Sequence, residues 1–169
     1  MNINMDPNVY YSASEEETHQ LGIDFASQLN PGDVVAFYGE LGSGKTEFIK
    51  GICSGMKVRE LVSSPTYTLM NEYTGLDKDS NTVPVCHMDL YRIESPGELE
   101  EAGLAETIED VHAIKLIEWA EHGNSIIPPV RYDVHFYATD DENGRRIEIV
   151  HRAGISLSTN GNGTSAYPG

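Results

Sequence analysis

One short segment has the residue types and the spacing of a phosphate-binding loop. Gly39–Thr46 reads Gly-Glu-Leu-Gly-Ser-Gly-Lys-Thr and fits the pattern G-x-x-x-x-G-K-[ST]. Its glycines allow the positive φ values that bring successive N–H groups around an anion. Lys45 would reach the β- and γ-phosphates of a nucleoside triphosphate, and the Thr46 hydroxyl would ligate Mg²⁺. The residues expected to contact the nucleotide are Leu41, Gly42, Ser43, Gly44, Lys45 and Thr46.

Two acidic residues are positioned to hold a metal ion beside this loop. Phosphoryl transfer needs Mg²⁺, screening of the phosphate charge and a positioned nucleophile. The metal normally needs a carboxylate at the end of a second strand, and both Glu118 and Asp89 follow short apolar runs. Each could instead be an ordinary acid at a strand end. The presence of a phosphate-binding loop in the same chain favours a functional role for both.

A further hydroxyl-rich segment could respond to the nucleotide. Ser64, Pro65 and Thr66 precede an alternating stretch, and a hydroxyl there could sense the γ-phosphate or Mg²⁺ as switch loops do. A plain turn before a strand is the alternative. Thr18 lies in the first turn of an expected helix, and its pattern alone favours an exposed hydroxyl. The chain has no N-K-x-D motif for reading guanine, so adenine is the expected base.

The elements that must position these residues can be read from the pattern. An apolar run at 34–38 directly precedes the loop, and apolar residues at helical spacing follow it as far as Gly55. Ser14 to Glu17 form a capping box that opens an earlier helix. Further strands are expected at 67–73, 83–88, 114–117, 132–138 and 146–151, with a polar connection over 74–82, and a short helix is expected from Ser95 to about Gly103. The pattern predicts a three-layer α/β domain with mixed strand directions.

The composition limits the classes of protein. The chain has 169 residues, which suits one domain, and 27 acidic against 11 basic residues give a net charge of −16. Such a surface repels nucleic acid. The two cysteines lie inside apolar elements and are expected to be buried free thiols. No apolar run is long enough to cross a membrane and no signal peptide is evident, so we expect a cytoplasmic protein. The domain should span residues 1–152, and the Gly-, Ser- and Asn-rich residues 153–169 should form a disordered tail.

Four segments together resemble the TsaE family of bacterial threonylcarbamoyladenosine-tRNA biosynthesis. They are the loop Gly39–Thr46, Ser-Pro-Thr-Tyr-Thr-Leu at 64–69, His-Met-Asp-Leu-Tyr-Arg at 87–92 and Ile-Glu-Trp at 117–119. Their order and approximate spacing match the family from residue 14 to about residue 138. The resemblance implies a P-loop NTPase-like fold, three-layered around a mixed parallel and antiparallel central sheet.

The resemblance also implies an activity and partners. It implies an ATP-binding and Mg²⁺-dependent ATPase that is slow alone and that allows the TsaB–TsaD pair to turn over, with tRNA contacted only indirectly. By this likeness Lys45, Asp89 and Glu118 are the catalytic residues, and Thr46 and Glu118 hold the metal. Asp89 would lie near the metal and the γ-phosphate, Ser64 to Thr68 would form the switch, and Thr18 would contact the nucleotide near the base.

Two other functions use the same loop. A small-molecule or nucleoside kinase would use Asp89 as base and Arg92 on the acceptor. Such kinases usually close an arginine-rich lid over the triphosphate, whereas Arg145 and Arg146 lie far along this chain, in a hairpin. A nucleotide-dependent binding module without useful catalysis is the third possibility. The roles of His87, Arg92 and Trp119 stay open between packing and function.

Overall fold

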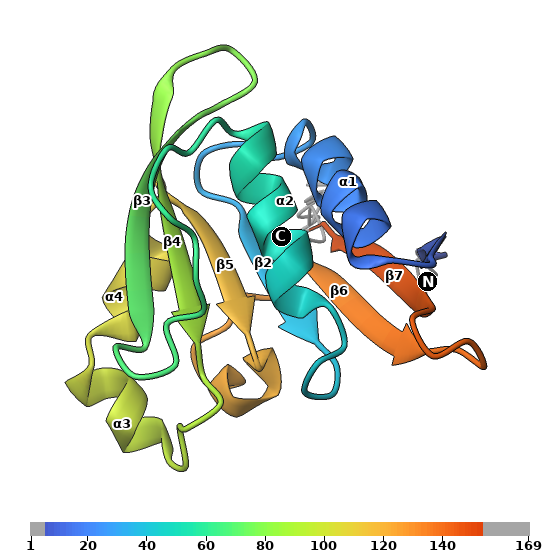
Figure 1. The fold of residues 1–169 in the computed structure, drawn as a ribbon. Helices are drawn as coiled ribbons and strands as arrows, with labels where there is room; N and C mark the ends of the chain where they lie inside the picture. The colour runs from blue at the N-terminus through green and yellow to red at the C-terminus, as the bar shows by residue number, and fades with distance from the viewer. Residues whose placement is uncertain (1–5, 154–169) are drawn as a thin grey trace, which may run out of the picture.

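A single seven-stranded sheet forms the centre of the molecule (Figure 1). The computed structural model describes residues 6–153, so residues 1–5 and nearly all of the expected tail, 154–169, lie outside the described part. The strand order is β1-β7-β6-β2-β5-β4-β3. The strands are β1 (Asn8–Ser12), β2 (Val34–Tyr38), β3 (Met70–Leu76), β4 (Thr82–Asp89), β5 (Ile114–Glu118), β6 (Arg131–Ala138) and β7 (Arg145–Arg152).

The strand directions are mixed, as predicted. β2 is parallel to both of its neighbours, β5 and β6, and β4 is parallel to β5. β3 is antiparallel to β4, and the other edge is built from the antiparallel pairs β6–β7 and β7–β1. The four parallel strands end at the same edge of the sheet, which brings the phosphate-binding segment after β2 beside the last residues of β4 and β5.

Helices cover the sheet on both faces, which confirms the three-layer prediction (Figure 1). α1 (Glu15–Ala26) and α2 (Lys45–Gly55) pack on one face, over a core that includes Phe25, Phe37 and Phe48. The other face packs against α3 (Pro96–Glu101), α4 (Leu104–Glu109) and the short 3₁₀ helix η1 (Ala120–Gly123), over a second apolar cluster. α4 passes behind the sheet in Figure 1.

The first helix begins where the capping box predicts. The Ser14 hydroxyl accepts a hydrogen bond from the Glu17 N–H, and the Glu17 carboxylate accepts one from the Ala13 N–H at 2.7 Å. α1 then packs directly against α2 through glycines. A Cβ added at Gly51 would lie 2.1 Å from the His19 carbonyl oxygen, so only glycine fits at this contact.

Two elements differ from the sequence expectation. β3 begins at Met70 instead of Tyr67, because the preceding residues form a turn in which the Leu69 N–H donates to the Pro65 carbonyl and Leu69 has φ +65°. The strand also continues to Leu76, which pairs with Thr82. Both residues lie in the segment 74–82 that was expected to be a polar connection. α4 was not predicted, because it is only six residues long and starts directly after Gly103.

Two smaller expectations concern the cysteines and the membrane. Cys53 and Cys86 are buried free thiols, as predicted. Burial raises the pKa of Cys53 to about 12 and that of Cys86 to about 11, so both thiols stay protonated at neutral pH. Within residues 6–153 none of the helices has the length and apolar character needed to cross a bilayer.

Candidate functional site

The phosphate-binding loop has the backbone geometry that its glycines predict. It follows β2 directly, and α2 begins at Lys45. Gly42 and Gly44 have φ values of +74° and +104°, which lie in the region that side-chain-bearing residues rarely adopt. Gly39 has φ +149°, and a Cβ there would meet the Ser43 hydroxyl at 2.8 Å. The loop therefore requires glycine at three positions.

Lys45 is buried and folded against its own loop. Its ammonium group donates to the carbonyl oxygens of Gly39 and Glu40, the second at 2.9 Å, and lies 4.5 Å from the centre of the Trp119 ring. Burial lowers the pKa of Lys45, although nearby carboxylates, Glu118 first among them, oppose that shift. The loop carbonyls thus hold the ammonium against the backbone of its own loop.

Glu118 joins the loop to the neighbouring strands. The Thr46 hydroxyl donates to its Oε1 at 2.9 Å, and the His87 ring lies 2.8 Å from its Oε2. Glu118 is 3 % exposed. Burial alone would raise the pKa of this carboxyl, but the contacts with His87, Thr46 and Lys45 outweigh it and hold the pKa below the ordinary value. The carboxylate is therefore ionised at neutral pH.

The expected switch segment lies over the same carboxylates. The Ser64 hydroxyl lies 2.8 Å from Asp89 Oδ2 and 3.4 Å from Glu118 Oε2, and the Thr66 hydroxyl lies 3.5 Å from that of Ser64. One cleft of about 400 Å³ is thus lined by the predicted loop residues from Leu41 to Thr46 and by Ser64, Thr66, Asp89 and Glu118, but not by Thr18 or Pro65. Its lining is Glu15, Leu41, Gly42, Ser43, Gly44, Lys45, Thr46, Glu47, Lys50, Ser64, Thr66, Asp89, Tyr91, Glu118 and Trp119.

The oxygen atoms of this cleft fit Mg²⁺. The Thr46 hydroxyl and the carboxylates of Glu118 and Asp89 are hard oxygen donors, which Mg²⁺ prefers. Among residues 6–153 no group of three or more His, Cys, Asp or Glu side chains could hold a metal ion. Mg²⁺ is commonly held by one or two carboxylates together with substrate phosphates and water.

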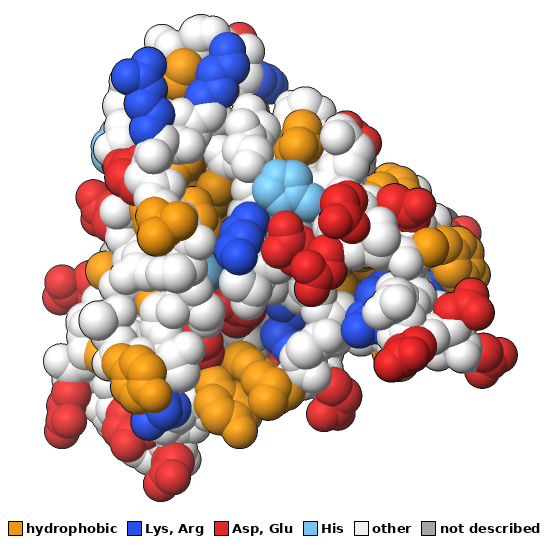
Figure 2. Space-filling view, viewed as in Figure 1, with side chains coloured by type: hydrophobic (Ala, Val, Ile, Leu, Met, Phe, Trp, Pro, Cys, Tyr) orange, Lys and Arg blue, Asp and Glu red, His pale blue; other side chains and the backbone are white. Residues whose placement is uncertain are grey.

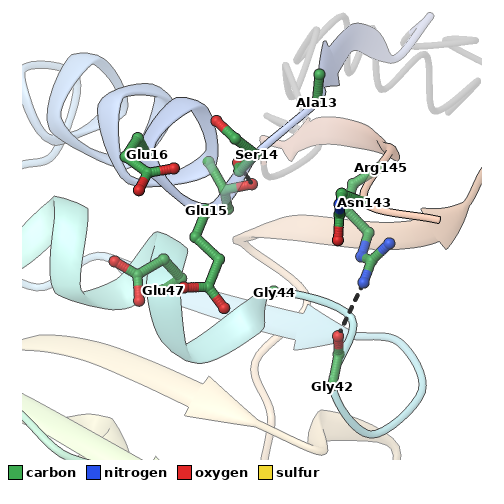
Figure 3. A pocket seen from close by; sticks show the side chains of 10 residues that line it. Ala13, Ser14, Glu15, Glu16, Gly42, Gly44, Glu47, Asn143 and Arg145 are labelled. Carbon is green, nitrogen blue, oxygen red and sulfur yellow. Dashed lines mark hydrogen bonds between the residues drawn. The ribbon is translucent and has the colours of Figure 1, made fainter. Parts of the chain in front are cut away.

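A second cavity of about 300 Å³ adjoins the loop on the side of α1 and the β6–β7 turn (Figure 3). Thr18 lines it, but the expectation of an exposed hydroxyl was wrong. Thr18 is 2 % exposed, and its hydroxyl lies 2.7 Å from that of Ser12 and donates to the Ser14 carbonyl at 3.1 Å. Its role in binding a nucleotide stays a prediction.

Three residues at the site were not assigned from the sequence. His87 contacts Glu118 from β4, and its position two residues before Asp89 places both on one face of the strand, a signal that was available. Trp119 has φ +54° and covers Lys45. Arg145 lies far along the sequence, in the β6–β7 hairpin, and was given no role at the loop, but its guanidinium donates to the carbonyls of Gly42 and Ser43. No local sequence signal could have indicated a contact across 103 residues.

Known proteins resemble this chain over most of its length. The family model "Threonylcarbamoyl adenosine biosynthesis protein TsaE" matches residues 12–147, more than half of the chain. The chain is 37% identical over 142 residues to the tRNA threonylcarbamoyladenosine biosynthesis protein TsaE of a Nostoc species, covering 82% of this chain and 83% of that protein. It is 36% identical over 132 residues to the TsaE of Bacillus subtilis, covering 78% of each.

A solved structure shares the fold. The crystal structure of Bacillus subtilis YdiB superposes with a TM-score of 0.69 at 28% identity, covering 88% of this chain and 87% of that one. This likeness supports the P-loop NTPase-like architecture inferred from the loop and the sheet. The family match and the identities over most of the chain lead to one conclusion: the chain belongs to the TsaE family.

Proposed function

We propose that this protein binds and hydrolyses ATP as an accessory protein of tRNA threonylcarbamoyladenosine modification, acting with the TsaB–TsaD pair to allow its turnover. The observation that carries the proposal is the 2.9 Å contact between the Thr46 hydroxyl and Glu118, which joins the phosphate-binding loop to the carboxylate at the end of β5. These two oxygen donors would hold Mg²⁺, which would supply charge screening at the phosphates. The relatives' names supply the pathway.

The predicted site residues of the cleft have separate roles in this proposal. Lys45 leaves the loop carbonyls and binds the β- and γ-phosphates. Thr46 and Glu118 would hold Mg²⁺, which would screen the phosphate charge. Asp89 and Glu118 are the two carboxylates available to orient the attacking water. Ser64 contacts both, so a shift of the segment with Pro65 and Thr66 would report the state of the nucleotide.

The cleft also suits activation by a partner. Its basic residues, within the described part of the chain, are Lys45 and Lys50, so no arginine of the lining stabilises the transferred phosphoryl group. Hydrolysis by the protein alone should therefore be slow. Leu41 and Tyr91 line the cleft and are 78% and 48% exposed, which fits coverage by another protein. We propose TsaD and TsaB as these partners.

The adjoining cavity would take the base and ribose, with Thr18 close to the base. The lining includes the main chain of Gly42 and Gly44, so a nucleotide could extend from the cavity to the loop. The net charge of −16 disfavours direct contact with tRNA, which the partners would bind. A cytoplasmic location follows from this role.

The experiment is ATP hydrolysis by the purified protein, alone and with the TsaB–TsaD pair. The wild type should show low turnover that rises with the partners. Lys45→Ala and Glu118→Ala should each reduce the partner-dependent rate by about 100-fold or more, because each removes charge stabilisation at the phosphates or the metal. Wild-type turnover in Lys45→Ala would refute the proposal. Phosphorylation of a nucleoside or a small alcohol, without dependence on the partners, would support the kinase alternative instead.

A further inference from the structure

The guanidinium of Arg145 binds backbone carbonyls of the phosphate-binding loop. Arg145 is the first residue of β7, and its side chain extends from the β6–β7 turn to the loop (Figure 3). Its Nε donates to the Ser43 carbonyl at 3.0 Å, and one terminal nitrogen donates to the Gly42 carbonyl at 3.2 Å. The other terminal nitrogen donates to the Gly144 carbonyl at 2.7 Å and lies 3.3 Å from that of Glu142. The turn therefore holds the guanidinium in place.

These contacts fix the orientation of peptide groups in the loop. A peptide is planar and trans, so its C=O and the next N–H point in opposite directions. The peptide between Gly42 and Ser43 is held at both ends, since Arg145 binds its carbonyl and the Ser43 N–H donates to the Glu40 carbonyl at 3.1 Å. In the next peptide, the bond to the Ser43 carbonyl directs the Gly44 N–H away from Arg145.

The loop needs a contact from another part of the chain, because glycines do not restrict its backbone to one conformation. Glycine populates positive and negative φ about equally, and binding a flexible loop to an anion costs the entropy of ordering it. We infer that Arg145 is a positioning residue that holds the loop in its anion-binding conformation before the nucleotide arrives. The inference rests on the proposed nucleotide binding for its functional consequence, but the ordering of the free loop does not depend on it.

The next residue provides a matched control. Arg146 lies on the opposite face of β7, where it forms an ion pair with Glu148 at 3.0 Å and lies 4.6 Å from the centre of the Tyr137 ring. It has the same charge and lies in the same strand. Lysine at position 145 is the conservative variant, because an ammonium keeps the charge but lacks the planar fork that binds two carbonyls together.

The test compares Arg145→Ala, Arg145→Lys and Arg146→Ala with the wild type. The first readout is amide hydrogen exchange of residues 42–46 in the nucleotide-free protein, and the second is the affinity for fluorescent ATP and ADP analogues. Arg145→Ala should exchange about tenfold faster in the loop and bind both nucleotides about tenfold more weakly, because the lost hydrogen bonds involve a charged donor. Arg145→Lys should be intermediate, and Arg146→Ala should match the wild type within about twofold.

The two readouts separate this inference from the proposed function. Unchanged loop exchange in Arg145→Ala would overturn the inference, as would equal effects of Arg145→Ala and Arg146→Ala. A wild-type protein that bound neither nucleotide would overturn the proposed function, and the exchange rates would still decide whether Arg145 orders the loop. Far-ultraviolet circular dichroism and thermal unfolding of each variant identify any that has lost its fold.

Discussion

At the scale of single residues, Glu118 connects the most distant parts of the site. Its two oxygens contact Thr46 from α2 and His87 from β4, and Ser64 lies within 3.4 Å. A buried carboxylate is costly unless such partners stabilise its ionised form. Here the contacts outweigh burial and lower the pKa of the carboxyl, so they also contribute to the stability of the fold.

Glu118 should therefore make folding sensitive to acid. Because its pKa is lower in the folded than in the unfolded protein, its contribution is fully present above the ordinary value of 4.5 and is lost as the pH falls through the folded value. Between about pH 6 and about pH 3, the free energy of unfolding should fall more in the wild type than in Glu118→Gln. Urea unfolding at each pH measures this.

Glu100→Gln is the control for the acid experiment, because Glu100 is an exposed glutamate on α3. It should retain the wild-type dependence on pH. An identical acid dependence in the wild type and in Glu118→Gln would contradict the assigned pKa shift.

The residues that could be predicted from sequence were those whose signal is local. Lys45 and Thr46 belong to one contiguous motif, and Asp89 and Glu118 could be recognised because each ends a strand. The structure brings all four together. The contact of Arg145 with the loop could not be predicted, because it depends on β7 lying two strands away from β2 in the sheet.

At the scale of elements, the packing of α1 on α2 determines the position of α2, the helix that follows the phosphate-binding loop. Two glycines, Gly22 and Gly51, allow the helix backbones to touch: a Cβ at the first would lie 2.2 Å from the Phe48 carbonyl oxygen. The nearest atoms at both positions are backbone carbonyl oxygens, which cannot move aside as the end of a side chain can. A methyl group can fit only if the helices separate.

Gly51→Ala should consequently destabilise the protein although alanine favours helices. The close approach to a backbone oxygen should make the overpacking cost about 3 kcal/mol, which exceeds the propensity gain of about 1 kcal/mol. Chemical denaturation measures the difference. Gly97→Ala in α3 is the control, since its Cβ would meet nothing nearer than 4.0 Å. Equal stability of Gly51→Ala and the wild type would show that the helices adjust freely.

Element boundaries were less predictable than element types. The alternation at 67–73 predicted a strand, but Tyr67 is 84% exposed and belongs to the turn closed between Pro65 and Leu69. The turn requires a left-handed conformation at Leu69, and leucine gives no sequence signal for that conformation. The strands of the β6–β7 hairpin were predicted from their apolar residues, although the connection spans 139–144 and neither Asn143 nor Gly144 has the positive φ of a two-residue turn.

At the scale of the whole molecule, the excess of acidic residues dominates the surface. Figure 2 shows acidic side chains spread over much of the visible face, with fewer basic ones between them. The net charge of −16 means that like charges repel across the folded molecule more strongly than in the expanded chain.

Salt should therefore stabilise the protein. Raising NaCl from about 10 mM to about 150 mM shortens the Debye length from about 30 Å to about 8 Å, which screens this repulsion. The thermal midpoint should rise by about 2–5 °C, as measured by differential scanning calorimetry. Sucrose of equal osmolality is the control and should raise the midpoint less. A midpoint that falls with salt would indicate that attractive ion pairs outweigh the repulsion.

The position of β7 has a consequence for the order of events during protein synthesis. β7 pairs with β1 through residues 145–149 and contains Arg145, so neither the pairing of β1 nor the contact with the loop can form before these residues have been synthesised. Contacts between residues so far apart in sequence form late and slowly. A nascent chain therefore carries Gly39–Thr46 long before it carries the strand whose first residue, Arg145, contacts that loop.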